Sequence, residues 1–129
     1  MKSKAKSIEV HQGDIPGGLD FGSSVAVDTE TRGLKLGRDR LCLVQVSAGD
    51  GNCHLVQFSE GGFDAPNLKA LITDKAVTKI FHYARFDMAA IKTYLGVWCQ
   101  PVYCTKIASK LARTYTDRHG LKDLCRELL

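Results

Sequence analysis

One stretch of the chain constrains the fold more than any other. Residues Ser24 to Glu30 read Ser-Val-Ala-Val-Asp-Thr-Glu, a short apolar run that ends in two acids. The run predicts a buried strand, and side chains alternate on an extended chain, so Asp28 and Glu30 point the same way. Two neighbouring anions repel each other, and hard carboxylate oxygens suit Mg²⁺ or Mn²⁺. The alternative is a strand that ends in a polar turn, where Asp28 bonds a loop amide.

A second segment supplies a third acid. Residues 79–91 predict a short strand that runs into a helix, and Met88, Ile91 and Leu95 form its apolar stripe. Asp87 lies beside this stripe in the first helical turn, where the helix N-terminus favours a negative charge. An inward-facing acid there can join the other two carboxylates. Three acids from two distant segments favour a metal site over a polar turn.

The remaining pattern predicts an α/β fold with a mixed sheet. Three successive strands precede an alternation of helix and strand, and Gly49 to Asn52 is a hairpin signal. A proline begins one helix and Gly96 ends another. The expected strands cover residues 8–11, 24–28, 41–47, 52–57, 77–82 and 101–104, and the expected helices cover 66–73 and 84–95, with two more helices toward the C-terminus.

Composition limits the class of protein. A chain of 129 residues with 44% hydrophobic content can build one core, so we expect a single domain over residues 1–129. The sequence has neither a long apolar run nor a signal peptide, which predicts a cytoplasmic protein without a membrane segment. Five cysteines without a Cys-x-x-Cys pair predict reduced thiols. The alternative is a zinc site at Cys99 and Cys104 that Cys125 or His119 completes.

The net charge of +4 suits a polyanionic partner without requiring one. Basic residues cluster around both acidic segments, which predicts a ring of cations that attracts a phosphate backbone. These residues are Arg32, Lys35, Arg38 and Arg40 after the first acids, and Lys79 and Arg85 around the second segment. The alternative is that each is an ordinary solvated loop charge.

Two motifs now carry a resemblance. Residues 28–34, followed by residues 39–47, resemble the first motif and second strand of the DEDD superfamily of 3′-to-5′ exonucleases, and ribonuclease D is the nearest group. Residues 82–87 resemble the second motif, a His or Asn five residues before an Asp. Residues 105–112 and 119–125 are similar to the helices that follow in ribonuclease D. The resemblance therefore covers nearly the whole chain.

This resemblance implies a ribonuclease H-like fold and a metal-dependent hydrolysis of phosphodiester bonds. It implies two Mg²⁺ or Mn²⁺ ions roughly 3.5 to 4 Å apart. Asp28 would bridge both ions, Glu30 would hold the ion on the attacking side, and Asp87 would hold the ion on the leaving side. All three are therefore the expected catalytic and metal-binding residues.

The resemblance also implies contacts with the single-stranded 3′ end of a nucleic acid. Leu34 would wedge between the last bases, and His82 would contact the terminal nucleotide. Phe86 would stack on a base or line the pocket. The amide of Thr29 would bond the terminal hydroxyl. Alternatively, Leu34 folds back on the core, and His82 is a hydrogen-bonded structural residue.

The third motif of the family, a Tyr or His four residues before the fourth acid, is not identified between Asp87 and Leu129. We therefore expect an incomplete exonuclease domain that lacks its C-terminal part, binds one metal weakly and is nearly inactive. The predicted function is that of a ribonuclease D-like 3′-5′ exoribonuclease. The alternatives are a DNA-directed 3′-5′ exonuclease and a catalytically inactive nucleic-acid-binding module. The oligomeric state is not predicted.

Overall fold

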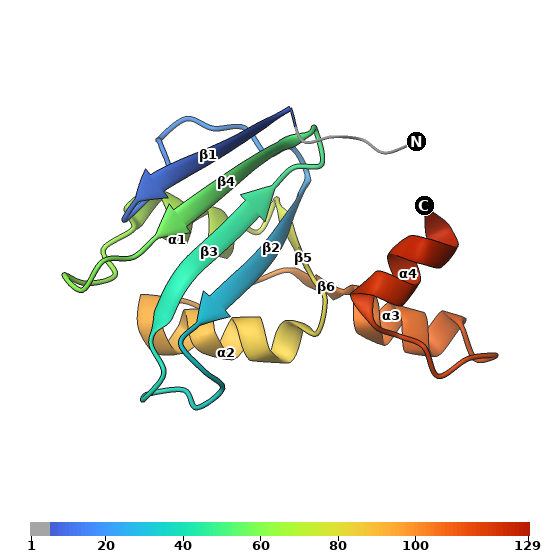
Figure 1. Cartoon of the computed structure of the whole chain (residues 1–129). Coiled ribbons are helices and arrows are strands. Elements are labelled where there is room, and N and C mark those ends of the chain that lie inside the picture. The colour runs from blue at the N-terminus through green and yellow to red at the C-terminus, as the bar shows by residue number, and fades with distance from the viewer. Residues whose placement is uncertain (1–5) are drawn as a thin grey trace.

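A mixed β-sheet organises the computed structural model, which describes residues 6–129. Its strands are β1 (Ser7–Gln12), β2 (Ser24–Thr31), β3 (Leu41–Ser47), β4 (Asn52–Gln57), β5 (Thr78–Phe81) and β6 (Val102–Cys104). Their order across the sheet is β1-β4-β3-β2-β5-β6 (Figure 1). Strands β2, β3 and β4 are antiparallel neighbours, whereas β1, β5 and β6 each join the sheet in parallel. The predicted mixed α/β sheet is therefore confirmed.

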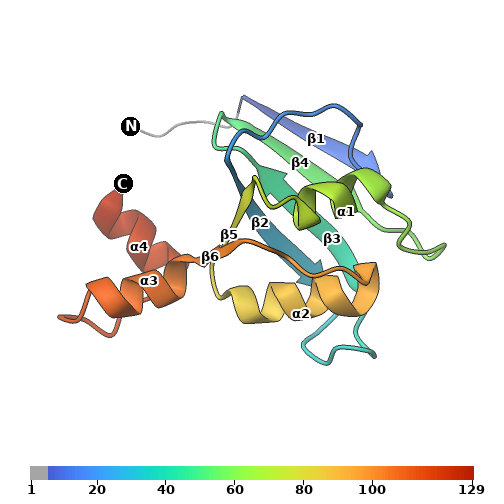
Figure 2. The same ribbon diagram turned by 180° about the vertical axis from the view of Figure 1, so that it is seen from behind.

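Four helices accompany the sheet. They are α1 (Pro66–Thr73), α2 (Ala84–Leu95), α3 (Thr105–Ala112) and α4 (Leu121–Leu128). Helices α1 and α2 cover one face of the sheet, while α3 and α4 lie to one side, beyond β6 (Figures 1 and 2). Within the described part of the chain, no helix covers the opposite face of the central strands (Figure 1). Among residues 6–129, no helix is both long enough and apolar enough to cross a membrane.

The core forms between the sheet and the two covering helices because the strands alternate. In β2, Val25 and Val27 are buried while Asp28 and Glu30 are exposed, so the two acids share the open face. Helix α2 buries Ile91 and Leu95 against this sheet. Burial of such aliphatic side chains contributes about 1.5–3 kcal/mol each relative to an exposed position.

The ends of α1 and α2 follow from local chemistry. Pro66 begins α1, and Asp14 accepts hydrogen bonds from the amides of Asn67 and Leu68 at 2.9 and 2.8 Å. Gly96 ends α2 with a φ of 76°, a conformation that glycine adopts without strain. Both ends match the expected boundaries.

Four strands differ from the sequence expectation in their boundaries, and β1, at Ser7–Gln12, is one residue longer at each end than the expected 8–11. Strand β2 continues to Thr31 rather than residue 28, because its pairing with β3 persists through Glu30 and resumes at Thr31 after an irregularity in the register. Asp28 and Glu30 therefore lie inside the strand and not in a turn behind it. Strands β5 and β6 are slightly shorter than expected, at Thr78–Phe81 and Val102–Cys104.

Candidate active site

The candidate site forms where β2 and β5 separate. These strands pair only from Ser24 to Ala26 of β2, so the next residues of β2 have no partner in β5. The first turn of α2 lies at this point. Oδ1 of Asp87 accepts hydrogen bonds from the backbone amide of Thr29 at 3.0 Å and from its hydroxyl at 2.6 Å. Asp87 is thus joined to the residue between Asp28 and Glu30.

Asp87 carries an unfavourable charge in this position. Its residue is only 5% exposed, and this burial raises the pKa of its carboxyl. The hydrogen bond from the Thr29 hydroxyl opposes the rise, but the charge of Asp28 raises the pKa further. The Asp28 and Asp87 carboxylates therefore repel each other near the first turn of α2. A bound cation would relieve both the burial and the repulsion.

Asp28 lines a groove on the open side of the sheet, and Glu30 lies two residues further along the same face of β2. Gln45, which lies opposite Asp28 in β3, donates a hydrogen bond of 3.3 Å to its Oδ2. The groove has a volume of about 470 Å³, and Asp28, Gln45, His82 and Leu121 contribute to its lining. The Asp28 and Glu30 carboxylates are thus exposed to solvent, whereas the Asp87 carboxylate is buried.

The three acids do not form one tight cluster. Within residues 6–129, the only three His, Cys, Asp or Glu ligand atoms that all lie within 4.8 Å of one another belong to Glu9, His11 and His54. A site for two ions roughly 3.5 to 4 Å apart does not need such closeness, because different carboxylates serve different ions. The oxygen donors present are nevertheless those that Mg²⁺ and Mn²⁺ prefer.

The expected substrate contacts occupy different environments. Leu34 is 85% exposed, which excludes the alternative that it folds back on the core. His82 lines the groove, and its Nδ1 lies 2.9 Å from the Thr105 hydroxyl, which itself donates to the Phe81 carbonyl. Phe86 is half-buried in the first turn of α2. The amide of Thr29 is already engaged by Asp87, so a substrate hydroxyl would have to replace that contact.

Burial lowers the pKa of His82, and the nearby charge of Lys106 lowers it further, while a contact with the backbone of His119 opposes both effects. The imidazole therefore favours its neutral form. Because the Thr105 hydroxyl donates to Phe81, Nδ1 of His82 is assigned as the donor to Thr105. The Thr105 contact holds the ring at the edge of the groove.

The loop between β2 and β3 is held by a residue that sequence reasoning missed. Asp39 accepts hydrogen bonds from the Lys35 amide at 2.9 Å and from the Arg38 guanidinium at 2.7 and 2.8 Å. The Arg38 side chain, followed by the Lys35 amide, lowers the pKa of Asp39 to about 2. Tyr94 of α2 donates from its hydroxyl to the Asp39 carbonyl at 2.8 Å. These contacts of Asp39, which we call the clamp, fix the loop that carries Leu34. No sequence pattern predicted them.

The predicted ring of cations is wrong at Lys79. This residue is 0% exposed, and its ammonium donates to the carbonyls of Asp74 and Val77 at 2.5 and 2.6 Å. Burial lowers the pKa of Lys79. Side chains alternate in exposure along β5, and Lys79 lies on the buried side. The number of basic residues in the sequence does not show on which side each one lies. The site must therefore draw its positive charge from elsewhere.

Three other basic residues contact neighbouring acids or carbonyls. The guanidinium of Arg38 pairs with Asp39, and that of Arg32 lies 3.5 Å from a carboxylate oxygen of Glu60. Arg40 donates to the carbonyl of Ser59. The exposed Arg85 remains on the surface of the first turn of α2. The ring of cations is thinner than the sequence suggested.

His119 and Asp123 stand four residues apart, a spacing of the third-motif kind that the sequence interpretation overlooked. Nδ1 of His119 lies 2.8 Å from the Ser109 hydroxyl, in the contact between α3 and α4. Asp123 turns back on the start of its own helix, because its Oδ2 lies 3.4 Å from where a Cβ of Gly120 would stand. Within residues 6–129, neither side chain belongs to a compact group of ligand atoms with the three acids. His119 and Asp123 are therefore engaged in contacts of the α3–α4 region.

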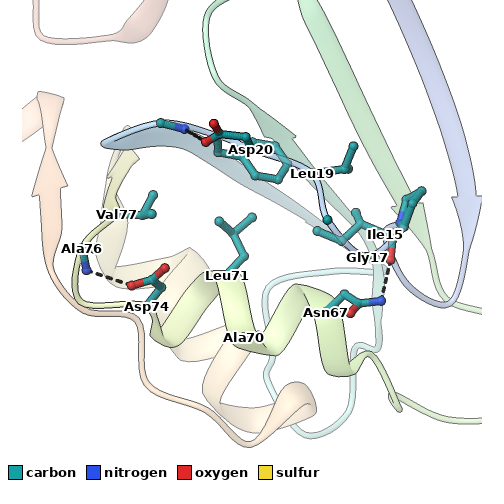
Figure 3. Close-up of a pocket in the computed structure, with 14 residues that line it drawn as sticks. Ile15, Gly17, Leu19, Asp20, Asn67, Ala70, Leu71, Asp74, Ala76 and Val77 are labelled. Atoms are coloured by element: carbon teal, nitrogen blue, oxygen red, sulfur yellow. Dashed lines mark hydrogen bonds between the residues drawn. The ribbon is translucent and has the colours of Figure 1, made fainter.

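A second hollow shares no lining residue with the groove. It has a volume of about 400 Å³ and is formed by residues 15–22, helix α1 and residues just after that helix (Figure 3). Its polar side chains are used locally: Asp74 accepts from the amide of Ala76, Asp20 accepts from that of Gly22, and Asn67 donates to the carbonyl of Ile15. These contacts shape a loop and leave no group directed at a ligand.

Comparison with known proteins now places the chain. A protein family described as 3′-5′ exonuclease matches residues 14–129. Ribonuclease D of Acidiphilium cryptum strain JF-5 is 33% identical over 104 residues, which are 81% of this chain and 26% of that protein. Structures of Brucella melitensis NrnC bound to pGG and with bound Mg²⁺ are 53% identical, with TM-scores of 0.92 and 0.91. Each match covers 95% of this chain and 61% of the NrnC chain. The chain belongs to the 3′-5′ exonuclease family, with ribonuclease D and NrnC among its relatives.

Proposed function

We propose that this domain hydrolyses phosphodiester bonds at the 3′ end of RNA with Mg²⁺ or Mn²⁺ held by Asp28, Glu30 and Asp87. The observation that carries the proposal is the contact between α2 and β2. There the Asp87 carboxylate accepts hydrogen bonds from Thr29 and is repelled by the charge of Asp28. A relative, Brucella melitensis NrnC, has a structure with bound Mg²⁺, and others are ribonuclease D enzymes. The proposal extends these properties to the present chain.

The donor set fits hard divalent ions because it consists of carboxylate oxygens. When bound, a pair of such ions supplies a hydroxide for attack and stabilises the leaving 3′ oxygen. Asp28 would contact both ions, Glu30 the attacking side and Asp87 the leaving side. The Thr29 hydroxyl and amide hold Asp87 in place, so the carboxylate oxygen that they leave unused is available to a cation.

We expect substrate positioning to involve His82 on the groove, together with Leu34 and Phe86 outside its lining. Leu34 projects from the clamped loop with 85% of its surface exposed, which suits an apolar contact with a terminal base. His82 lies on the groove with its Nδ1 engaged by Thr105, and Phe86 offers a half-buried ring. Structures of NrnC include one bound to pGG, which makes pGG and short RNA the first substrates to test.

The chain supplies three of the four acids that a two-metal site of this family uses. We therefore expect it to bind one Mn²⁺ weakly and to cleave RNA slowly. Isothermal titration of the metal-free protein with Mn²⁺ measures this directly. Two tight, independent sites in this chain would contradict the ligand count.

An Asp28→Asn variant tests the assignment of the site. We expect Mn²⁺ binding to be lost and any 3′-to-5′ shortening of a 5′-labelled single-stranded RNA to fall by about 100-fold or more, since Asp28 would contact both ions. Asp64→Asn is the matched control, because Asp64 is an exposed acid outside the groove. Wild-type Mn²⁺ binding by Asp28→Asn would end the assignment.

Two other functions give different results. A DNA-directed exonuclease would shorten a DNA strand of the same sequence faster than the RNA. A catalytically inactive binding module would bind the RNA without shortening it in Mn²⁺. The source gene gives a further test: a Tyr or His four residues before an Asp beyond codon 129 supports the enzyme, and an in-frame stop codon supports the binding module.

A further inference from the structure

A second cluster of ligand-type side chains lies on the opposite face of the sheet from Asp28. Val10 of β1 and Leu55 of β4 lie in register with Asp28, through Gln45 of β3. Because side chains alternate along a strand, the adjacent residues Glu9, His11 and His54 face the opposite side of the sheet. Glu9 and His11 are two residues apart on β1, and Glu9 is directly opposite His54 on β4. Strand alternation thus brings one carboxylate and two imidazoles together.

The three ligand atoms form a compact triangle. Nε2 of His11 lies 3.0 Å from Nδ1 of His54, and Oε2 of Glu9 lies 4.0 and 3.9 Å from these two nitrogens. An ion in the plane of these three atoms and equidistant from them would lie about 2.1 Å from each, close to the zinc–ligand distance in proteins. For a tetrahedral ion, the two nitrogens would move slightly apart and the Glu9 carboxylate would move closer to them.

Hydrogen bonding explains the contact between the two imidazoles but not the position of the Glu9 carboxylate. A proton can join His11 to His54, but the Glu9 distances are too long for a hydrogen bond. The imidazoles are held rather than free: their side chains are 14% and 12% exposed, the rings stack with centroids 5.2 Å apart, and Phe21 packs edge-on against His54. A single cation would satisfy all three groups at once.

We propose that Glu9, His11 and His54 form a Zn²⁺ site that ties the edge strand β1 to β4. Two imidazoles and one carboxylate suit Zn²⁺ and disfavour Mg²⁺, which prefers oxygen ligands alone. A neighbouring hollow of about 190 Å³, lined partly by Glu9, Asp20, Asp50 and His54, leaves room for water in the fourth position. Because β1 pairs with β4 alone, the ion would hold an edge strand in the sheet.

The test is Zn²⁺ titration of the full chain, freed of any purification tag and of bound metal, in a millimolar excess of Mg²⁺. We expect one Zn²⁺ per chain and a rise in Tm on binding. His11→Gln and His54→Gln should each weaken the affinity by at least about tenfold and abolish the rise in Tm. His119→Gln is the matched control, because it removes an imidazole outside the cluster, and it should bind Zn²⁺ as the wild type does.

Three results would overturn the proposal. They are the absence of Zn²⁺ binding by the wild type, unchanged affinity in the double variant of His11 and His54, and loss of Zn²⁺ binding in Asp28→Asn, which would assign the ion to the exonuclease site. The spectrum of bound Co²⁺ provides a second readout. We expect tetrahedral bands without thiolate absorption, and thiolate bands would assign the ion to cysteine. Equal far-UV spectra and equal Tm in EDTA show that the variants fold.

Discussion

Asp87 shows at the scale of one residue how a buried charge opposes stability. Its folded-state pKa is raised by burial, so its contribution to stability is present below the unfolded pKa and is lost as the pH rises through the folded pKa. Asp87→Asn keeps an oxygen that accepts from Thr29 but removes the charge. In metal-free buffer at pH 7 we expect its Tm to exceed that of the wild type by a few degrees.

This gain should fade as the pH falls below the usual range of an Asp, because wild-type Asp87 is then neutral as well. Thermal unfolding from pH 3 to 7 measures the effect, and Asp64→Asn supplies an exposed control that should follow the wild type. A lower Tm for Asp87→Asn at pH 7 would show that its charge is already compensated without metal.

The loop between β2 and β3 acts as one element because Asp39 holds it from inside. A Cβ added to Gly33 would lie 2.4 Å from Oδ2 of Asp39, the oxygen that accepts from the Lys35 amide. Gly33→Ala must therefore displace the clamp, and we expect it to destabilise the fold by about 1–3 kcal/mol in urea unfolding. Gly61→Ala is the control, since its nearest neighbour would be at an ordinary 3.9 Å. Equal losses in the two variants would contradict the clamp.

At the scale of the whole molecule, the α3–α4 pair is held mainly by its own contacts. Buried Arg113 donates to the Ser109 hydroxyl and the Arg118 carbonyl at 2.9 and 2.8 Å and pairs with Glu127. The pair lies beyond β6 at one side of the sheet (Figure 1). We expect hydrogen exchange in α3 and α4 to be faster than in β2 and β3. Arg113→Met should speed exchange in the helices alone, and equal protection of both regions would refute this division.

Periodicity made most of the fold predictable. The apolar runs at residues 41–47 and 52–57 and the helices at 66–73 and 84–95 match the structure, because their signals are local: alternation, Pro66 at a helix start and Gly96 at an end. The end of β2 was missed because pairing with β3 extends the strand through polar residues. The hydrogen bonds that extend β2 are made with β3, a separate segment that the local pattern around β2 does not include.

The sequence by itself determined the chemistry of the candidate site: two acids on one face of a strand, a third at a helix start, and the family motifs around them. Tertiary structure alone decided which groups meet. It buried Lys79 away from the acids, bonded Asp87 to Thr29, closed the loop on Asp39 and placed His11 beside His54. The physical reason is that side-chain type and alternation are local properties, whereas charge burial and ligand distance depend on which strands become neighbours.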